Sequence, residues 1–272
     1  MRKQGKRFKF YVRAVASLLS MALFSPMMVM ASDQSHSVGS KKTYSGPHAH
    51  WGYSGAEGPK NWGRLSSAYG ECSAGKNQSP IDIRNSSFYE LDELQFDYQQ
   101  FVLEIVNNGH TIQVNNTGYG NLQIAGESYD FLQLHFHTPS EHMINGRHAP
   151  LEMHLVHKSK SGRLAVLGVM IEEGDENVEL EKVWFNMPEI ASEKVKMNTV
   201  SFEPRNVLPE SRDYFHYNGS LTTPPCSEGV RWFVFNQPIQ MSSFQIDKFM
   251  RVVGENARPV QSLFARSVRS SR

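Results

Sequence analysis

The chain has 272 residues, of which 28 are Lys or Arg, 27 are Asp or Glu, and only two are Cys. The six charged residues among the first 31 are all basic, so residues 32–272 carry 22 Lys and Arg against 27 Asp and Glu. This acidic balance argues against a nucleic-acid partner, which needs a basic face. The length suits one large core, because β-rich folds of this size are often single domains.

Residues 1–31 are predicted to be a secretory signal peptide. A basic start is followed by a mostly apolar run over 14–30, and Val29 and Ala31 supply small residues at the usual cleavage spacing. The alternative is an uncleaved membrane anchor, but the run is short and interrupted by Pro26, and no later stretch is long enough to span a bilayer. We therefore expect export to the periplasm or medium, without a stable membrane anchor.

The two cysteines, Cys72 and Cys226, are expected to form a disulfide. An even cysteine count in an exported chain favours a bridge, whereas in the cytosol the same pair would be expected to be free thiols.

After a polar, Ser-rich segment over 32–45, which is expected to be flexible, residues 46–268 are predicted to form one domain. Many Gly, Trp, Tyr and Pro residues up to Lys76 suggest irregular packed loops. Helical periodicity is confined to 178–186 and 243–253. Alternating apolar runs predict strands over 101–107, 110–116, 120–125, 128–137, 151–158, 163–172 and 230–236. Asn108-Gly109 and Ser161-Gly162 predict turns between them. The fold class is therefore α+β, dominated by strands.

Six of the eleven histidines lie between His135 and His157, five of them in QLHFHTPSEH (133–142) and LEMHLVH (151–157). Side chains of a strand alternate between its faces, so His135 and His137 share one face of the first strand. His154 shares a face with Glu152 in the second. If the two strands are neighbours, three imidazoles converge, which is the plan of a catalytic zinc site with its fourth position left to water. A pair of strand histidines alone is more often structural.

The chain resembles an α-class carbonic anhydrase from about Trp51 to Phe264. The matching segments are HWGY (50–53), NQSPIDI (77–83), NNGHTIQV (107–114), QLHFH (133–137), SEH (140–142), LEMHLVH (151–157), LAVLGV (164–169), GSLTTPPCSE (219–228) and NARPVQ (256–261). The short TPS stretch after His137 is similar to bacterial or plant-like members. The resemblance implies a large, mostly antiparallel central sheet with short peripheral helices, and marks Ser79-Pro80 and Pro224-Pro225 as candidates for cis bonds.

The resemblance also implies the metal centre and its supports. Zn²⁺ would be held by His135, His137 and His154. Gln133 would orient His135, Glu152 would orient His154, and the backbone carbonyl of Asn256 would orient His137.

Further roles carry over from the same family pattern. The Thr222 hydroxyl would donate to buried Glu141, and so orient zinc-bound hydroxide toward CO₂. His110 would be the proton shuttle, because an imidazole titrates near neutral pH. Tyr53, Asn108 and Gln113 would order the intervening water. The CO₂ pocket would be lined by Val156, Val166, Leu221, Thr223, Val230 and Trp232.

The predicted function is reversible hydration of CO₂ to bicarbonate and a proton by zinc-hydroxide attack, with His110 exporting the proton. Sulfonamides or anions are expected to inhibit, and the chain is expected to be a monomer or homodimer. Two alternatives stay open. One is a zinc hydrolase acting mainly on esters, and the other is a non-catalytic binding module of the same fold. A non-catalytic module is disfavoured because such modules typically lack one ligand histidine.

Overall fold

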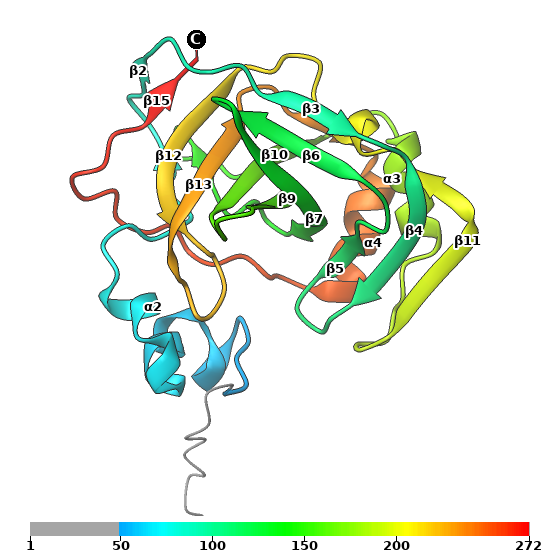
Figure 1. Cartoon of the computed structure of the whole chain (residues 1–272). Coiled ribbons are helices and arrows are strands. Elements are labelled where there is room, and N and C mark those ends of the chain that lie inside the picture. The colour runs from blue at the N-terminus through cyan, green and yellow to red at the C-terminus, as the bar shows by residue number, and fades with distance from the viewer. Residues whose placement is uncertain (1–48, 272) are drawn as a thin grey trace, which may run out of the picture. The chain divides into compact units, whose positions relative to one another are not determined.

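The computed structural model describes residues 49–271 (Figure 1). The predicted signal peptide over 1–31 and the predicted flexible segment over 32–45 lie outside the described residues. The limits of 46–268 for the domain stay a prediction.

One sheet of 13 strands dominates the described chain, as Figure 1 shows. Its main path runs β11-β4-β5-β7-β9-β10-β13-β12-β15-β2, with β6 bridging β3 and β7 and with β14 beside β10. The strands of this sheet are β2 (Ser87–Phe88), β3 (Gln95–Tyr98), β4 (Phe101–Asn107), β5 (Ile112–Asn115), β6 (Gly120–Ile124), β7 (Glu127–His137), β9 (Leu151–Ser159), β10 (Leu164–Glu173), β11 (Lys194–Phe202), β12 (Tyr214–Ser220), β13 (Glu228–Phe235), β14 (Ile239–Met241) and β15 (Arg269–Ser270). A separate parallel pair joins β1 (Asp82–Ile83) to β8 (Met143–Ile144).

Most strand pairs are antiparallel, as predicted, and parallel pairs occur at β10–β13, β10–β14 and β15–β2. The two predicted turns are confirmed: Asn108-Gly109 joins antiparallel β4 and β5, and Ser161-Gly162 joins antiparallel β9 and β10. Strand β5 begins at Ile112 rather than His110, because the Asn108 side chain accepts the backbone N–H groups of both His110 and Thr111 and holds them in the turn.

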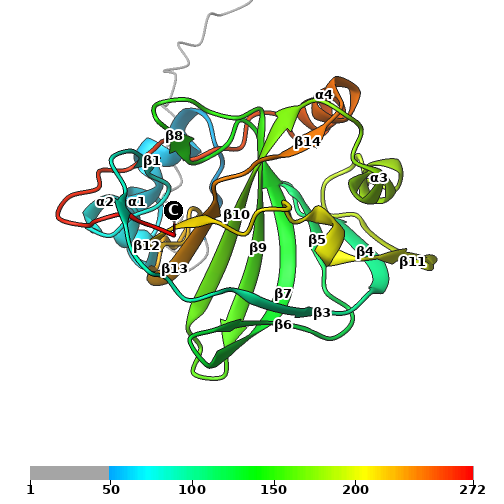
Figure 2. The same ribbon diagram turned by 90° about the horizontal axis from the view of Figure 1, so that it is seen from above.

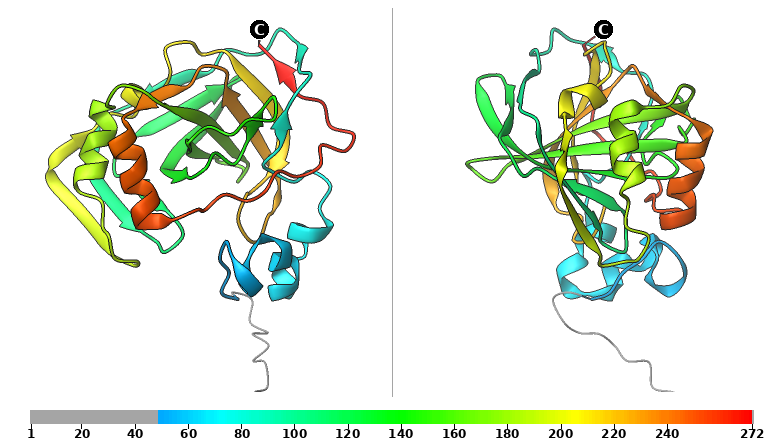
Figure 3. Two further views of the ribbon diagram at one scale, coloured as in Figure 1. Left: turned by 180° about the vertical axis from the view of Figure 1, so that it is seen from behind. Right: turned by 90° about the vertical axis from the view of Figure 1, so that its right-hand side faces the viewer.

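Two predicted helices are present, α3 (Val178–Phe185) and α4 (Ser243–Val253). They lie beside each other on one side of the strands (Figures 2 and 3). Helix α4 begins with a capping box, in which the Ser242 hydroxyl accepts the Gln245 N–H and the Gln245 side chain accepts the Ser242 N–H.

The segment expected to be irregular loops up to Lys76 contains short helical turns instead. They are η1 (Gly55–Glu57), η2 (Pro59–Asn61), α1 (Trp62–Leu65), η3 (Ser67–Tyr69) and α2 (Glu71–Ala74), with a further turn, η4 (Pro204–Val207), after β11. Each has three or four residues, too few to produce a helical hydrophobic period in the sequence. These N-terminal turns pack around Trp62, which is fully buried.

The large core fills one face of the central strands, and a smaller apolar cluster lies on the other. Leu134, Phe136, Met153 and Leu155 of β7 and β9 belong to the large core. The smaller cluster includes Val166, Val230 and Trp232. The alternation of β7 and β9 therefore places His135, His137, Glu152 and His154 on the face opposite the large core.

Candidate metal centre

Strands β7 and β9 are direct neighbours, and their register places His135 opposite His154 and His137 opposite Glu152. Directly opposed residues of an antiparallel pair project from the same face. The three predicted ligands therefore meet on one face of the sheet. One ligand nitrogen from each of His135, His137 and His154 lies within 4.8 Å of the others.

In each histidine, the second ring nitrogen already has a partner. His135 Nδ1 lies 2.8 Å from Gln133 Oε1, His137 Nδ1 lies 2.8 Å from the Asn256 carbonyl, and His154 Nε2 lies 2.9 Å from Glu152 Oε1. These contacts leave Nε2 of His135, Nε2 of His137 and Nδ1 of His154 free to face one another. Anchoring the far nitrogen fixes the tautomer and the ring angle of a metal ligand.

Two buried atoms at this centre have no hydrogen-bond partner, His137 Nε2 and Glu141 Oε2, and they lie 3.5 Å apart. Burial lowers the pKa of His137, and burial together with the charges of the other two histidines holds the pKa of His135 well below its usual value. For His154, burial also lowers the pKa, but the charge and hydrogen bond of Glu152 outweigh burial and raise it. Neutral imidazoles with free lone pairs, the form that the shifts of His135 and His137 favour, are the form in which histidine binds a metal. The donor set thus fits a divalent cation that prefers nitrogen, and Zn²⁺ is the common one.

Glu152 is the hub of a buried network beneath the ligands. Although burial raises the pKa of this carboxyl, His142 and His154 outweigh burial and hold it well below the usual value. Its Oε1 lies 2.7 Å from His142 Nδ1, and its Oε2 accepts the His142 backbone N–H at 2.8 Å. His142 Nε2 lies 2.6 Å from the Tyr217 hydroxyl, which lies 2.8 Å from Ser79 Oγ. A carboxylate so constrained cannot swing away from His154.

Sequence reasoning did not assign His142, Tyr217 or Ser79 to the site. The only signal was the presence of His142 in the matching SEH segment and of Ser79 in NQSPIDI. Tyr217 lies on β12, far along the sheet path from β7, so nothing in the sequence pairs it with His142.

The implied hydrogen bond between Thr222 and Glu141 is not formed among the residues that the structure describes. Glu141 Oε1 instead accepts the Arg258 backbone N–H at 2.9 Å, and Oε2 lies toward two imidazoles, 3.5 Å from His137 Nε2 and 3.9 Å from His154 Nδ1. Thr222 itself is buried.

Asn256 ties the metal centre to the loop that carries His110. Its side-chain nitrogen donates to the backbone carbonyls of His110 and Phe136, and its side-chain oxygen accepts the Thr138 N–H at 2.7 Å. Its own carbonyl supports His137. One residue therefore fixes both a ligand and the backbone at the predicted shuttle.

A cavity of about 140 Å³ opens above the histidines. It is lined by Trp51, Tyr53, Asn108, His110, Thr111, Gln113, Gln133, His135, His137 and Thr223. The three residues predicted to order water, Tyr53, Asn108 and Gln113, are all among them, and Gln113 stands directly opposite His135 in the register of β5 and β7. The cavity is thus polar around its mouth.

His110 lies at that mouth with its ring stacked on Trp51, at a centroid distance of 3.8 Å and an interplanar angle of 7°. Burial, and to a smaller degree the neighbouring His50, lowers its pKa from the usual value. The ring centroids of His50 and His110 are 6.5 Å apart. The group is therefore neutral at pH 7 and able to accept a proton.

The predicted apolar wall is assembled by the fold. Val166, Val230 and Trp232 are buried in the smaller cluster, and Val156 and Leu221 pack against it. The Trp232 ring contacts His154 edge-on at a centroid distance of 4.8 Å. This wall adjoins the ligands, although it does not line the 140 Å³ cavity.

The predicted disulfide between Cys72 and Cys226 is present, and Cys226 N–H donates to the Thr223 carbonyl. The bridge ties helix α2 to the loop between β12 and β13, which carries Thr222 and Thr223 (Figure 1). Ser79-Pro80 and Pro224-Pro225 are both cis, as is Thr138-Pro139.

A family model described as eukaryotic-type carbonic anhydrase matches residues 57–272. The chain belongs to the α-class carbonic anhydrase family. It is 44% identical over 225 residues to a carbonic anhydrase of Neisseria gonorrhoeae, covering 82% of this chain and 88% of that protein. It is 42% identical to one from Pectobacterium carotovorum, over 80% of this chain and 90% of the relative. This carbonic anhydrase is therefore an enzyme of the carbonate dehydratase class.

The structure of the α-carbonic anhydrase from Thermovibrio ammonificans in complex with sulfanilamide is similar to this chain, with a TM-score of 0.80 and 51% identity over 82% of this chain and 99% of that one. The α-carbonic anhydrase of Photobacterium profundum aligns with a TM-score of 0.77 at 44% identity, over 81% of this chain and all of that one. Within residues 49–271 of the present carbonic anhydrase, no helix has both the length and the apolar character needed to cross a membrane.

Proposed function

We propose that this carbonic anhydrase hydrates CO₂ with a zinc ion held by His135, His137 and His154. The observation that carries the proposal is the set of three converging nitrogens within 4.8 Å of one another, each on a ring whose far nitrogen is already anchored. In carbonic anhydrases, the enzymes for which this value is established, bound zinc lowers the pKa of its water to about 7 and so supplies the nucleophile.

The surrounding residues prepare the site for that ion. Gln133, Glu152 and the Asn256 carbonyl hold the ligand rings in one orientation. Glu141 adds a buried negative charge 3.5 Å from His137 Nε2. Thr222, on the loop braced by the disulfide, orients the nucleophile in our proposal.

The two remaining tasks are assigned to two separate surfaces beside the ligands, the apolar wall and the polar cavity. The apolar wall of Val156, Val166, Leu221, Val230 and Trp232, with Thr223 beside it, receives uncharged CO₂. His110 accepts the proton that hydration releases and passes it to solvent, through water ordered by Tyr53, Asn108 and Gln113. This division suits the geometry, because the mouth is polar and the wall next to His154 is apolar.

The test is CO₂-hydration activity before and after removal of zinc by a chelator, with zinc content measured alongside. We expect activity and zinc to disappear together and to return together when zinc is restored. His154→Ala should bind no zinc, whereas His50→Ala, which removes an exposed histidine outside the ligand set, should retain it. Full activity in the metal-free protein would refute the proposal.

The two alternative functions, an ester hydrolase and a non-catalytic module, can be distinguished from CO₂ hydration. An ester hydrolase would use a general acid or base near the metal, and the two carboxyl groups close to the ligands, Glu141 and Glu152, each already accept a backbone N–H. Comparing CO₂ hydration with the hydrolysis of an activated ester would separate the two activities. A non-catalytic module is disfavoured because all three ligand histidines are present and converge.

We also propose that the protein is exported, since a buried disulfide suits an oxidising compartment. Sulfonamides and small anions are expected to inhibit by reaching the cavity above His135. Intact-mass analysis of the protein isolated from its native compartment would test cleavage near Ala31, and gel filtration would separate monomer from homodimer.

A further inference from the structure

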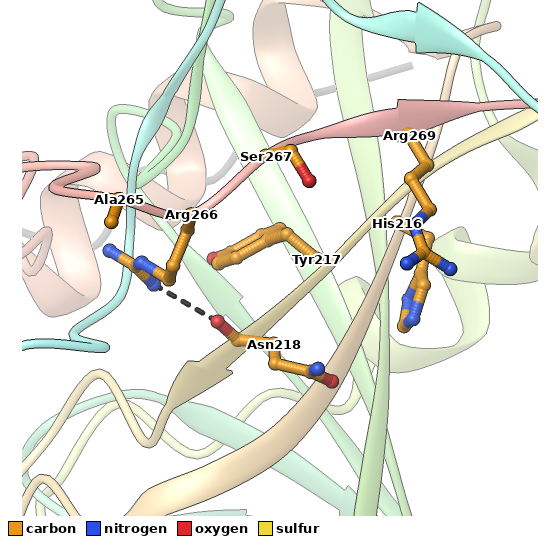
Figure 4. Close-up of a pocket in the computed structure, with 7 residues that line it drawn as sticks. All are labelled: His216, Tyr217, Asn218, Ala265, Arg266, Ser267 and Arg269. Atoms are coloured by element: carbon orange, nitrogen blue, oxygen red, sulfur yellow. Dashed lines mark hydrogen bonds between the residues drawn. The ribbon is translucent and has the colours of Figure 1, made fainter.

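A group of basic side chains lies on the sheet at β12, β13 and β15, apart from the metal centre. The register places Arg269 of β15 opposite His216 of β12, and His216 opposite Phe233 of β13. The next row along the same face pairs Asn218 with Arg231. Because opposed residues on neighbouring strands lie about 5 Å apart, the two arginines flank the histidine. Figure 4 shows Arg269 and His216 next to each other.

Two hollows meet at this place and share His216 and Asn218 in their walls. The first, of about 270 Å³, also contains Arg266 and Arg269. The second, of about 630 Å³, also contains Arg163 and Arg231. We call these two adjoining hollows together the arginine groove, and no carboxylate lines either of them.

The cations of the arginine groove are only partly neutralised: the Tyr129 hydroxyl accepts from Arg231 and donates to Glu127, so this carboxylate acts on Arg231 without pairing with it. Within residues 49–271, neither Arg231 nor Arg269 forms an ion pair; Arg231 donates to the Tyr129 hydroxyl at 3.1 Å, and Arg269 lies over the Tyr89 ring. Arg266 donates only to backbone carbonyls (Figure 4), and Arg163 alone pairs with a carboxylate, that of Glu127.

Like charges placed side by side on a sheet cost stability unless something separates or neutralises them. The cluster stands out because the described chain as a whole is acidic: residues 49–271 carry 19 Lys and Arg against 26 Asp and Glu. An anion bound between the row that contains Arg269 and the row that contains Arg231 would offset the repulsion between these two arginines. Guanidinium groups favour oxyanions, since their planar fork matches two oxygens at once.

His216 makes the arginine groove sensitive to protonation. Its Nδ1 donates to the Trp232 carbonyl at 2.8 Å, so in the neutral ring Nε2 carries a lone pair that repels an anion. Protonation turns Nε2 into a donor. The charged groups that act on the ring are Arg231, Arg269 and, with opposite sign, Asp92. Burial and the two arginines lower the pKa of His216, and a bound anion would oppose the arginines and raise it.

We propose that the arginine groove binds an oxyanion of the sulfate or phosphate type, held by Arg231 and Arg269 and by the protonated ring of His216. The anion is either free in solution or one unit of a polyanion that also reaches Arg163 in the second hollow. Binding is tighter in acid than in alkali, because only the protonated imidazole donates to the ligand.

The test titrates sulfate, whose charge does not change in this range, into the zinc-loaded full chain at pH ~5.5 and ~8, and follows the NMR signals of the His216 ring. Signals of His216 report on the arginine groove alone, so anion binding at the metal centre does not enter the measurement. We expect the sulfate dissociation constant to be about tenfold lower at the acidic pH and the pKa of His216 to rise with sulfate.

Variants decide whether the arginine groove is responsible. Arg231→Gln and Arg269→Gln should each weaken sulfate binding about tenfold, and His216→Gln, followed through Asn218, should abolish the pH dependence. Arg251→Gln is the matched control, since Arg251, like Arg269, is exposed and lies over an aromatic ring, that of Phe244, on helix α4. All variants should retain CO₂ hydration.

Binding of dextran sulfate, a polyanion, distinguishes the two sources of the ligand, a free oxyanion and one unit of a polyanion. If Arg163→Gln weakens binding of the polymer but not of free sulfate, the ligand is a polyanion; if it weakens neither, the ligand is a small free oxyanion. The proposal is overturned if wild-type protein fails to bind sulfate at the acidic pH, or if Arg251→Gln weakens binding as much as Arg231→Gln.

Discussion

His157 gives a sharp prediction about stability in acid. The side chain is completely buried in the large core, where its ring lies 5.2 Å from that of Phe131 and Nε2 lies 2.7 Å from the Tyr98 hydroxyl. Burial is the main cause that lowers the pKa of His157 from 6.5 to about 3. Replacing it with glutamine keeps a polar atom for Tyr98 and removes the titration.

The sign and size of the effect follow from the two pKa values. At pH 7 the ring is neutral in both the folded and the unfolded chain, so it adds no pH dependence. Below about pH 6.5 the unfolded chain takes up a proton that the folded chain refuses until about pH 3. The free energy of unfolding therefore falls as pH drops, by about 2 kcal/mol at pH ~5 and by about 5 kcal/mol near pH ~3, at 1.36 kcal/mol per pH unit.

The measurement is denaturant unfolding of wild type and His157→Gln at pH ~7 and ~5. Zinc loss in acid affects both proteins equally. The change in the free energy of unfolding between the two pH values, compared between wild type and variant, therefore isolates the contribution of His157. We expect the wild type to lose about 2 kcal/mol more than the variant over this interval. Equal losses in the two proteins would refute the assignment of a neutral, buried His157.

Three other changes have distinct expected outcomes. Replacing Cys72 and Cys226 together by serine should lower the free energy of unfolding by up to about 5 kcal/mol, because the bridge spans 154 residues; no change on denaturant unfolding would contradict this. Gly168→Ala would place a Cβ 2.9 Å from Glu152 Oε1 and should weaken zinc binding by about 10- to 100-fold in competition with a chelator, whereas Gly52→Ala, with open space around it, should have no effect. His110→Ala should lower kcat by roughly 10- to 100-fold in weak buffer, leave kcat/KM nearly unchanged and be rescued by imidazole; an unchanged kcat would remove His110 as the shuttle.

The long strands were predictable because each keeps one face in the core. Strands β4, β7, β9 and β10 alternate or are uniformly apolar over seven or more residues, and their limits lie within one residue of the predicted ones. Strands β11 and β12 were missed. In β11, KVKMNTVSF is mostly exposed at the sheet edge and its register shifts between Met197 and Ser201, so no sustained alternation survives in the sequence.

The convergence of the three histidines was predictable for a different reason, since His135 and His137 lie in one strand and need only the period of two. The position of His154 opposite His135 required the pairing of β7 with β9, which the family resemblance supplied and local pattern does not. The partners of Glu152 show the limit of this reasoning. His142 follows a cis Thr138-Pro139 bond in a loop, and Tyr217 is three strands away along the sheet path.

The arginine groove is a second feature that local sequence pattern does not predict. Most of its basic residues lie in the turn before β10 (Arg163), on β12 (His216), on β13 (Arg231) and on the last strand, β15 (Arg269). In the sequence they are isolated charges with acidic residues around them. Only the register of β15 on β12 places Arg269 beside His216. Because β15 pairs with β12 through just two residues, a single-residue slip would turn Arg269 to the other face. The register of this short strand therefore determines whether Arg269 joins Arg231 beside His216.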